Sequence, residues 1–318
     1  MVGGERGGAV SATFSAPTTL AEVLDALASG AVPLAGGTDL VVGHRQGKRV
    51  LPDALVNLDG VVDLRGIVEA HDGSLLIGAL TNHEAIVNDE RVRAHYPALA
   101  DASSIVGSAA TRATGTIGGN VMNASPAADT IAPLLCHDAI AVFRSKAGER
   151  RVPLSGLFIG PGRTTAAVGE LLVGIELAPS GSTTGGAYVR LEYRRQMEIA
   201  IVGAAAVVRL DSSGRVEHAR VAMTALAPTI ERVPAAELAL LGTDAGDGAA
   251  RAAAEAVAAA ARPISDVRGS ANYRRAMAAV ITRRAVTAAA NRARGGNVCI
   301  PASDSTFGGS AGNGGWGA

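Results

Sequence analysis

Two glycine pairs, each set in a run of β-forming residues, constrain this chain more than any other feature. One lies in PLAGGTDLVV (33–42) and the other in GTIGGNVMN (115–123). Consecutive glycines let several backbone N–H groups converge on one point, and such a nest suits the oxygens of a diphosphate. Taken singly and from the residues alone, each pair fits an ordinary tight turn better than a ligand site, because Gly-Gly commonly marks turns.

The two loops supply most of the candidate ligand-binding residues. They are Leu34, Ala35, Gly36, Gly37, Thr38, Asp39, Leu40 and Val41 in the first loop, and Thr116, Ile117, Gly118, Gly119 and Asn120 in the second. Thr38 can add a hydroxyl donor and Asn120 an amide. Asp39 would repel a phosphate, so we expect it to point elsewhere or to set the turn. Asp129 suits a sugar or ribitol hydroxyl, for which a carboxylate is a good acceptor.

Composition argues against several classes of partner and cofactor. The 318 residues carry 29 Lys plus Arg and 29 Asp plus Glu, so no net charge would attract nucleic acid or an anionic membrane. Cys136 and Cys299 form no CxxC pair, and the six histidines lack HxH or HExxH spacing, so no iron–sulfur cluster or other metal site is expected on this chain. The sequence offers neither a membrane-spanning run nor a signal-peptide core, which favours a cytoplasmic location.

Hydrophobic periodicity predicts an α+β chain. Helical spacing marks residues 17–30, 81–103, 247–263 and 270–294, whereas β-forming runs mark 54–61, 74–80 and 170–177. A DSSG turn joins two apolar runs between residues 199 and 226 into a predicted hairpin.

A Gly/Ser/Thr-rich break at 179–186 is the predicted domain boundary. Before it, we expect an N-terminal α/β part at 1–59 and a second α/β part at 60–178. After it, we expect a sheet-plus-helices domain at 183–294. The Gly/Ser-rich tail at 295–318 is predicted to be disordered.

Five separated motifs, in this order, resemble the FAD-binding (medium) subunits of the molybdenum hydroxylases, the family of carbon monoxide dehydrogenase and of the flavin domain of xanthine dehydrogenase. They are PLAGGTDLVV, GTIGGNVMNASPAADTIAPLL, ELLVGIELAP, YRRQMEIAIVGAAA and ISDVRGSANYRRAMAAVITRRA. The resemblance implies a two-part α/β FAD-binding domain of the PCMH/VAO-like type, followed by a C-terminal domain with a small antiparallel sheet and helices.

The same resemblance implies roles for single residues. Both glycine loops would hold the diphosphate of FAD, and Asp129 would bind the ribityl or ribose hydroxyls. Leu172 would line the flavin region, and Arg190 stands where relatives often have a lysine near the flavin. Glu198 replaces a commoner aspartate, which keeps the charge on a longer side chain.

The function that the resemblance implies is electron transfer. FAD on this chain would pass electrons from the 2Fe-2S clusters of a partner subunit to an external acceptor, while a molybdopterin subunit oxidises the substrate. The chain would then need no catalytic residue of its own, and the complex is expected to be a dimer of heterotrimers. Two alternatives stay open at this point: a stand-alone flavoprotein reductase or oxidase of the related fold, and a non-catalytic FAD-binding homologue. The sequence names neither the substrate nor the electron acceptor.

Overall fold

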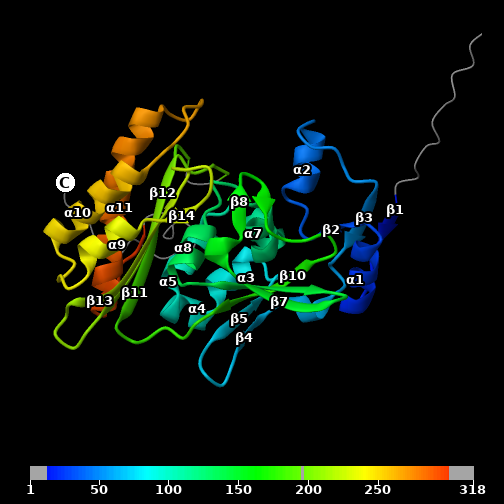
Figure 1. The fold of residues 1–318 in the computed structure, drawn as a ribbon, viewed down its shortest axis with the longest axis horizontal. Coiled ribbons are helices and arrows are strands. Elements are labelled where there is room, and N and C mark those ends of the chain that lie inside the picture. Colours follow the sequence, from blue (N-terminus) through cyan, green and yellow to red (C-terminus); the bar gives the residue numbers. More distant parts are fainter. Residues whose placement is uncertain (1–12, 195–196, 301–318) are drawn as a thin grey trace, which may run out of the picture.

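The computed structural model describes residues 13–194 and 197–300. Figure 1 shows three regions along the long axis, with the N-terminal region (blue) at one end, the C-terminal helices (yellow to orange) at the other, and the second α/β region between them. Residues 1–12, 195–196 and 301–318 lie outside the described part, so most of the tail predicted to be disordered is not covered. Ile300 is buried against the C-terminal domain.

The N-terminal region is a small parallel sheet with two helices. Its strands follow the order β1-β3-β2, and both pairings are parallel. The first helix begins with a capping box, in which Thr19 and Glu22 satisfy each other's backbone N–H groups. The elements are β1 (Thr13–Ser15), α1 (Leu20–Ala28), β2 (Val32–Leu34), α2 (Leu40–Arg45) and β3 (Ala54–Asn57).

The second region contains a five-stranded antiparallel sheet of order β4-β5-β10-β6-β7, a two-stranded sheet of β8 and β9, six short α-helices and two 3-10 helices. Its strands are β4 (Ile67–Glu69), β5 (Leu75–Gly78), β6 (Ile140–Ser145), β7 (Gly148–Pro153), β8 (Phe158–Gly160), β9 (Arg163–Thr164) and β10 (Leu171–Leu177). Its helices are η1 (Val62–Leu64), α3 (His83–Asn88), α4 (Glu90–His95), α5 (Pro97–Ser104), α6 (Ala109–Thr114), α7 (Ile117–Asn123), α8 (Ile131–Cys136) and η2 (Leu154–Gly156).

The helical spacing predicted for 81–103 is confirmed, and the segment is divided into three helices, because Asp89 ends α3 and caps α4, and Pro97 opens α5. One sequence prediction needs correction in this region. The TIGGN segment is not a turn. Thr116 caps α7, and Gly118 and Gly119 occupy the first turn of that helix.

The C-terminal domain contains the predicted hairpin within a four-stranded antiparallel sheet of order β11-β12-β13-β14. Its elements are β11 (Thr184–Leu191), β12 (Val202–Leu210), β13 (Val216–Thr224), β14 (Glu231–Arg232), α9 (Pro234–Leu240), α10 (Asp247–Ala260) and α11 (Ala271–Ala293). Helix α11 covers one face of the sheet, and α5 and α8 of the second region cover the other. The strands therefore bury both faces, which explains uninterrupted apolar runs such as VGAAAVV.

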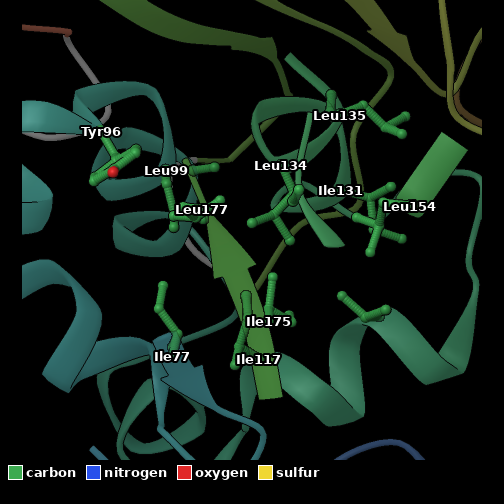
Figure 2. Packing of buried hydrophobic residues seen from close by; sticks show 14 of the residues in the cluster. Ile77, Tyr96, Leu99, Ile117, Ile131, Leu134, Leu135, Leu154, Ile175 and Leu177 are labelled. Atoms are coloured by element: carbon green, nitrogen blue, oxygen red, sulfur yellow. The ribbon is translucent and has the colours of Figure 1, made fainter. Parts of the chain in front are cut away.

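The main hydrophobic core lies between the five-stranded sheet and helices α5, α7 and α8. Figure 2 shows Ile117 and Ile175 side by side at one end of this cluster with Ile77 nearby, and Leu134 and Leu177 farther along it. A smaller cluster, which includes Val56 of β3, joins the N-terminal region to the second one. Within the described residues, no helix combines the length and the apolar composition that a membrane crossing requires.

Aspartates of the second region bind arginines of the C-terminal domain across the seam between the two. Asp101 of α5 accepts two hydrogen bonds from Arg292 of α11, at 2.6 and 3.1 Å. Asp138, which follows α8, pairs with Arg220 at 3.0 Å and with Arg232 at 2.6 Å. The seam thus combines apolar packing with ion pairs, and these hold the C-terminal domain on the region that carries the second glycine loop.

Candidate functional site

The two glycine loops, about 80 residues apart in the sequence, meet in the structure. A methyl group on Gly36 would lie 2.0 Å from the carbonyl oxygen of Thr114, so only glycine permits this approach. A methyl group on Gly115 would lie 3.5 Å from the Thr38 hydroxyl. Nearby, Arg49 donates to the side chain of Asn123 at 2.8 Å and ties the segment after α2 to the end of α7. The first loop therefore sits directly against the start of the second.

The first loop has the features of an anion-binding nest. It leaves β2 at Leu34, turns at Gly37, whose φ of +67° favours glycine, and enters α2 at Leu40. In the described part of the chain, the N–H groups of residues 36–39 donate to no acceptor. Asp39 is exposed, and its side chain makes no capping bond to α2. Three half-exposed residues, 36–38, and the exposed Asp39 thus offer N–H groups to a ligand.

The second loop does not form the nest that the sequence suggests. Its N–H groups are used within the protein, to anchor the start of α7 to the end of β5 and to cap the helix. The donor–acceptor pairs are Ile117–Thr81, Gly118–Ala79, Gly119–Thr116 and Asn120–Thr116, at 2.9 to 3.0 Å. The two glycines differ in their surroundings. A methyl group on Gly118 would lie 2.7 Å from Ala79, whereas one on Gly119 would meet only the Thr116 hydroxyl. Gly118 therefore serves packing, and Gly119 presents backbone on the open side.

Asp129 is held in a buried polar network. Its carboxylate accepts from the Tyr188 hydroxyl at 2.8 Å and from Arg190 at 2.7 Å. The next residue, Thr130, donates to the Asn120 side chain at 2.7 Å and so links this network to the second loop. The structure thus brings Asp129 and Arg190 together, as buried partners across the domain seam.

Burial and neighbouring charges shift the pKa values of Asp129 and Tyr188 in this network. Burial raises the pKa of Asp129, and the Arg190 guanidinium and the Tyr188 hydroxyl oppose that shift. Burial and the Asp129 charge raise the pKa of Tyr188 well above its usual value, so this phenol is a hydrogen-bond donor at neutral pH. Arg190 also contacts Glu192, while its Nε is buried with no acceptor in the described residues. The network therefore retains an unused donor.

The other two residues named by resemblance have different surroundings. Leu172 on β10 is 4% exposed and belongs to the main core, so protein covers it. Glu198 pairs with Arg194 at 3.0 Å, and this hydrogen bond lowers its pKa. Its backbone carbonyl faces Arg190 at 3.4 Å, which places the segment beside the Asp129 network.

Sequence reasoning missed four residues of this region: Tyr188, His83, Arg112 and Arg49. Tyr188 could have been found, because it lies two positions before Arg190 and residues i and i+2 share one face of a strand. His83 is brought to Gly115 only by the pairing of Asn82 with Thr116, which joins positions far apart in the chain. No local pattern carries that information.

These residues fit an FAD molecule. The free N–H groups of the first loop suit a diphosphate, and the close approach at Gly36 fixes the loop geometry. The open side of Gly119 and the Asn120 amide lie on the adjoining helix, and Asn120 connects through Thr130 to the Asp129 network. The arrangement thus places free N–H groups, an amide and a carboxylate network along two adjoining regions, where they can bind a dinucleotide cofactor.

Comparison with known proteins agrees with this assignment. The family model described as the FAD binding domain in molybdopterin dehydrogenase matches residues 10–179, and the CO dehydrogenase flavoprotein C-terminal domain matches residues 187–289. The carbon monoxide dehydrogenase medium chain of Hydrogenophaga pseudoflava is 34% identical over 279 residues, which span 87% of this chain and 96% of that one. The xanthine dehydrogenase FAD-binding subunit of Escherichia coli O157:H7 is 32% identical over 89% of this chain and 98% of its own length.

Solved structures give the same result. A carbon monoxide dehydrogenase from Hydrogenophaga pseudoflava superposes with a TM-score of 0.83 at 34% identity, covering 88% of this chain and 97% of that one. Quinoline 2-oxidoreductase from Pseudomonas putida 86 gives a TM-score of 0.82 at 29% identity, with 88% and 97% covered. Fold and site thus define an FAD-binding flavoprotein. This chain belongs to the family of FAD-binding subunits of the molybdopterin dehydrogenases, and the predictions of fold, family and FAD are confirmed.

Proposed function

We propose that this chain is the electron-transfer subunit of a molybdenum hydroxylase complex, with an iron–sulfur subunit as electron donor. Bound FAD supplies the redox chemistry, because it can accept electrons from a one-electron carrier and pass them on in pairs. Relatives named as carbon monoxide, xanthine and 6-hydroxypseudooxynicotine dehydrogenase subunits match 82% to 89% of this chain in sequence. The observation that carries the proposal is the pair of glycine loops, which meet where the first loop has free N–H groups.

The residues of this chain bind and orient the cofactor. We assign the diphosphate to the free N–H groups of the first loop, with the Thr38 hydroxyl beside them. The open side of Gly119 and the amide of Asn120 border the same cofactor on the second α/β region. Asp129 and Arg190, which are paired with each other, border the cofactor beyond Asn120. The contact of Asp129 with ribityl or ribose hydroxyls would add to its bonds with Tyr188 and Arg190.

The complex we propose follows the division of labour in the family. The molybdopterin subunit oxidises the substrate, the iron–sulfur subunit carries the electrons, and the assembly is a dimer of heterotrimers in the cytoplasm. The domain scheme is the predicted one, with the FAD-binding parts at 1–59 and 60–178 and the C-terminal domain at 183–294. A stand-alone reductase or oxidase is the less favoured reading, since the fold neighbours include complete subunits of carbon monoxide dehydrogenase.

Titration of the purified full-length chain with FAD tests the binding part of this proposal. We expect saturation at one FAD per chain and a rise in melting temperature as FAD is added, because a ligand that binds only the folded state stabilises it. A chain that saturates with another nucleotide but leaves FAD free in solution would contradict the proposal.

A further inference from the structure

Arg112, in α6, is a buried cation that the fold does not neutralise. Its side chain is 7% exposed, and the hydrogen bond it makes in the described residues is to the carbonyl oxygen of Val106 at 3.4 Å. No carboxylate of the described part lies in salt-bridge contact with it, and Glu84, which favours its charge from a distance, is exposed. A buried guanidinium without an anion is unfavourable, so the native complex is expected to provide one.

His83 lies beside this cation and has an unused hydrogen-bonding atom. Its ring is 1% exposed, and its Nδ1 is buried with no partner among the described residues. Burial, reinforced by the Arg112 charge, lowers the pKa of His83 to about 4, so the ring is neutral at physiological pH. The histidine therefore does not compete with Arg112 for an anion.

His83 lies where the two glycine loops meet. Its Cδ2 atom is 3.6 Å from the position of a methyl group on Gly115, and the Thr38 hydroxyl is 3.5 Å from the same position. Helices α3 and α6, which carry His83 and Arg112, contact each other, and the Arg112 charge acts on the His83 ring. The unneutralised charge is therefore a neighbour of the residue that borders the meeting point of the loops.

We propose that Arg112, with neutral His83 beside it, supplies the positive charge that holds the diphosphate of FAD at the meeting point of the two loops. The inference rests on the proposed FAD function and deepens it. The first loop offers dipoles but no cation, and a diphosphate with two negative charges needs both. Arg112 then acts as a positioning residue. It contributes to the affinity for the diphosphate and has no part in the redox step.

Binding of three ligands to the purified full-length chain tests the proposal: FAD, ADP, which keeps the diphosphate, and riboflavin, which lacks it. In Arg112→Met, we expect affinity for FAD and ADP to fall together by about tenfold to a hundredfold, as for a lost charge-assisted interaction. Riboflavin binding should stay unchanged, and Arg112→Lys should recover most of the lost affinity. Arg93→Met, which removes an exposed arginine of neighbouring α4, is the matched control and should bind all three ligands normally.

The melting temperature of the FAD-free variants distinguishes this role from a structural one. Removing an unneutralised buried charge should leave the FAD-free Arg112→Met chain at least as stable as the wild type, while the FAD-induced rise becomes smaller. His83→Phe removes the unpartnered nitrogen. Without FAD this variant should also be at least as stable as the wild type, and its FAD-induced rise in melting temperature should also be smaller. A variant that melts earlier without FAD, or fails to fold, would overturn the proposal. So would equal losses of riboflavin and ADP affinity, or FAD binding that stays normal while association with the iron–sulfur subunit is lost. A wild-type chain that ignores FAD would instead refute the proposed function itself.

Discussion

The ion pair between Asp101 and Arg292 gives the sharpest prediction about how the two domains are held together. Asp101 is 5% exposed, accepts two bonds from Arg292, and also accepts the N–H of Tyr188 at 3.2 Å. Asp101→Asn removes the charge and presents an NH2 group to the guanidinium. Breaking a buried pair usually costs about 3–5 kcal/mol. Arg292 keeps the carbonyl oxygens of Gly186 and Val298, so we expect the lower end, about 3 kcal/mol.

Calorimetric unfolding of the FAD-free chain measures this effect. A loss of about 3 kcal/mol corresponds to a fall of roughly 4–5 °C in melting temperature for a chain of 318 residues, because the unfolding entropy grows with chain length. Glu217→Gln is the matched control, because it breaks the exposed pair between Arg209 and Glu217 and should cost less than about 1 kcal/mol. The double variant Asp101→Asn/Arg292→Met should recover part of the loss. If Asp101→Asn lowers the melting temperature no more than Glu217→Gln does, the pair does not hold the seam and our reasoning is wrong.

Three further predictions concern the loops, the buried histidines and the cofactor. Gly36→Ala should abolish most FAD binding, since its methyl group would lie 2.0 Å from the Thr114 carbonyl, whereas Gly248→Ala, in open space on α10, should retain full flavin content in the same absorbance assay. Burial lowers the pKa of His137 to about 4, below the unfolded value of about 6.5, so the unfolded chain binds more protons between these pH values. The contribution of neutral His137 to the free energy of unfolding should be complete above pH 6.5 and should decrease by about 2 kcal/mol by pH 5. A His137→Phe chain whose stability depends on pH as steeply as that of the wild type would contradict this. Acid precipitation should release all of the flavin into the supernatant, and colour that stays with the pellet would instead indicate a covalent bond.

Helix caps and the hairpin turn could be predicted from the sequence, because they depend on residues close together in the chain. Thr19 and Ser270 cap α1 and α11, as their positions before apolar periodic runs indicate, and the DSSG turn joins β12 to β13. The Gly-Gly pair of the first loop was a sound signal, because Gly37 has a positive φ and the neighbouring N–H groups are free.

The sequence failed where tertiary contacts decide the outcome. TIGGN was predicted as a second N–H nest, yet the carbonyl oxygen of Ala79, just after β5, accepts the N–H of Gly118, and the segment starts a helix. The role of Asp129 at sugar or ribityl hydroxyls stays a prediction, but its bonds with Tyr188 and Arg190 of the C-terminal domain could not be predicted from the local sequence. The position of Arg112 beside His83 was likewise not predictable, since it depends on the contact of α3 with α6.

The central claim is that FAD on this chain receives its electrons from an iron–sulfur partner, and anaerobic mixing tests it most directly. The FAD-loaded chain would be mixed with its chemically reduced iron–sulfur subunit while the visible flavin absorbance is recorded. We expect bleaching only when the partner is present, and none when the organic substrate is added to the isolated chain. Turnover of that substrate by the isolated chain, or a flavin that stays oxidised beside the reduced partner, would contradict the account.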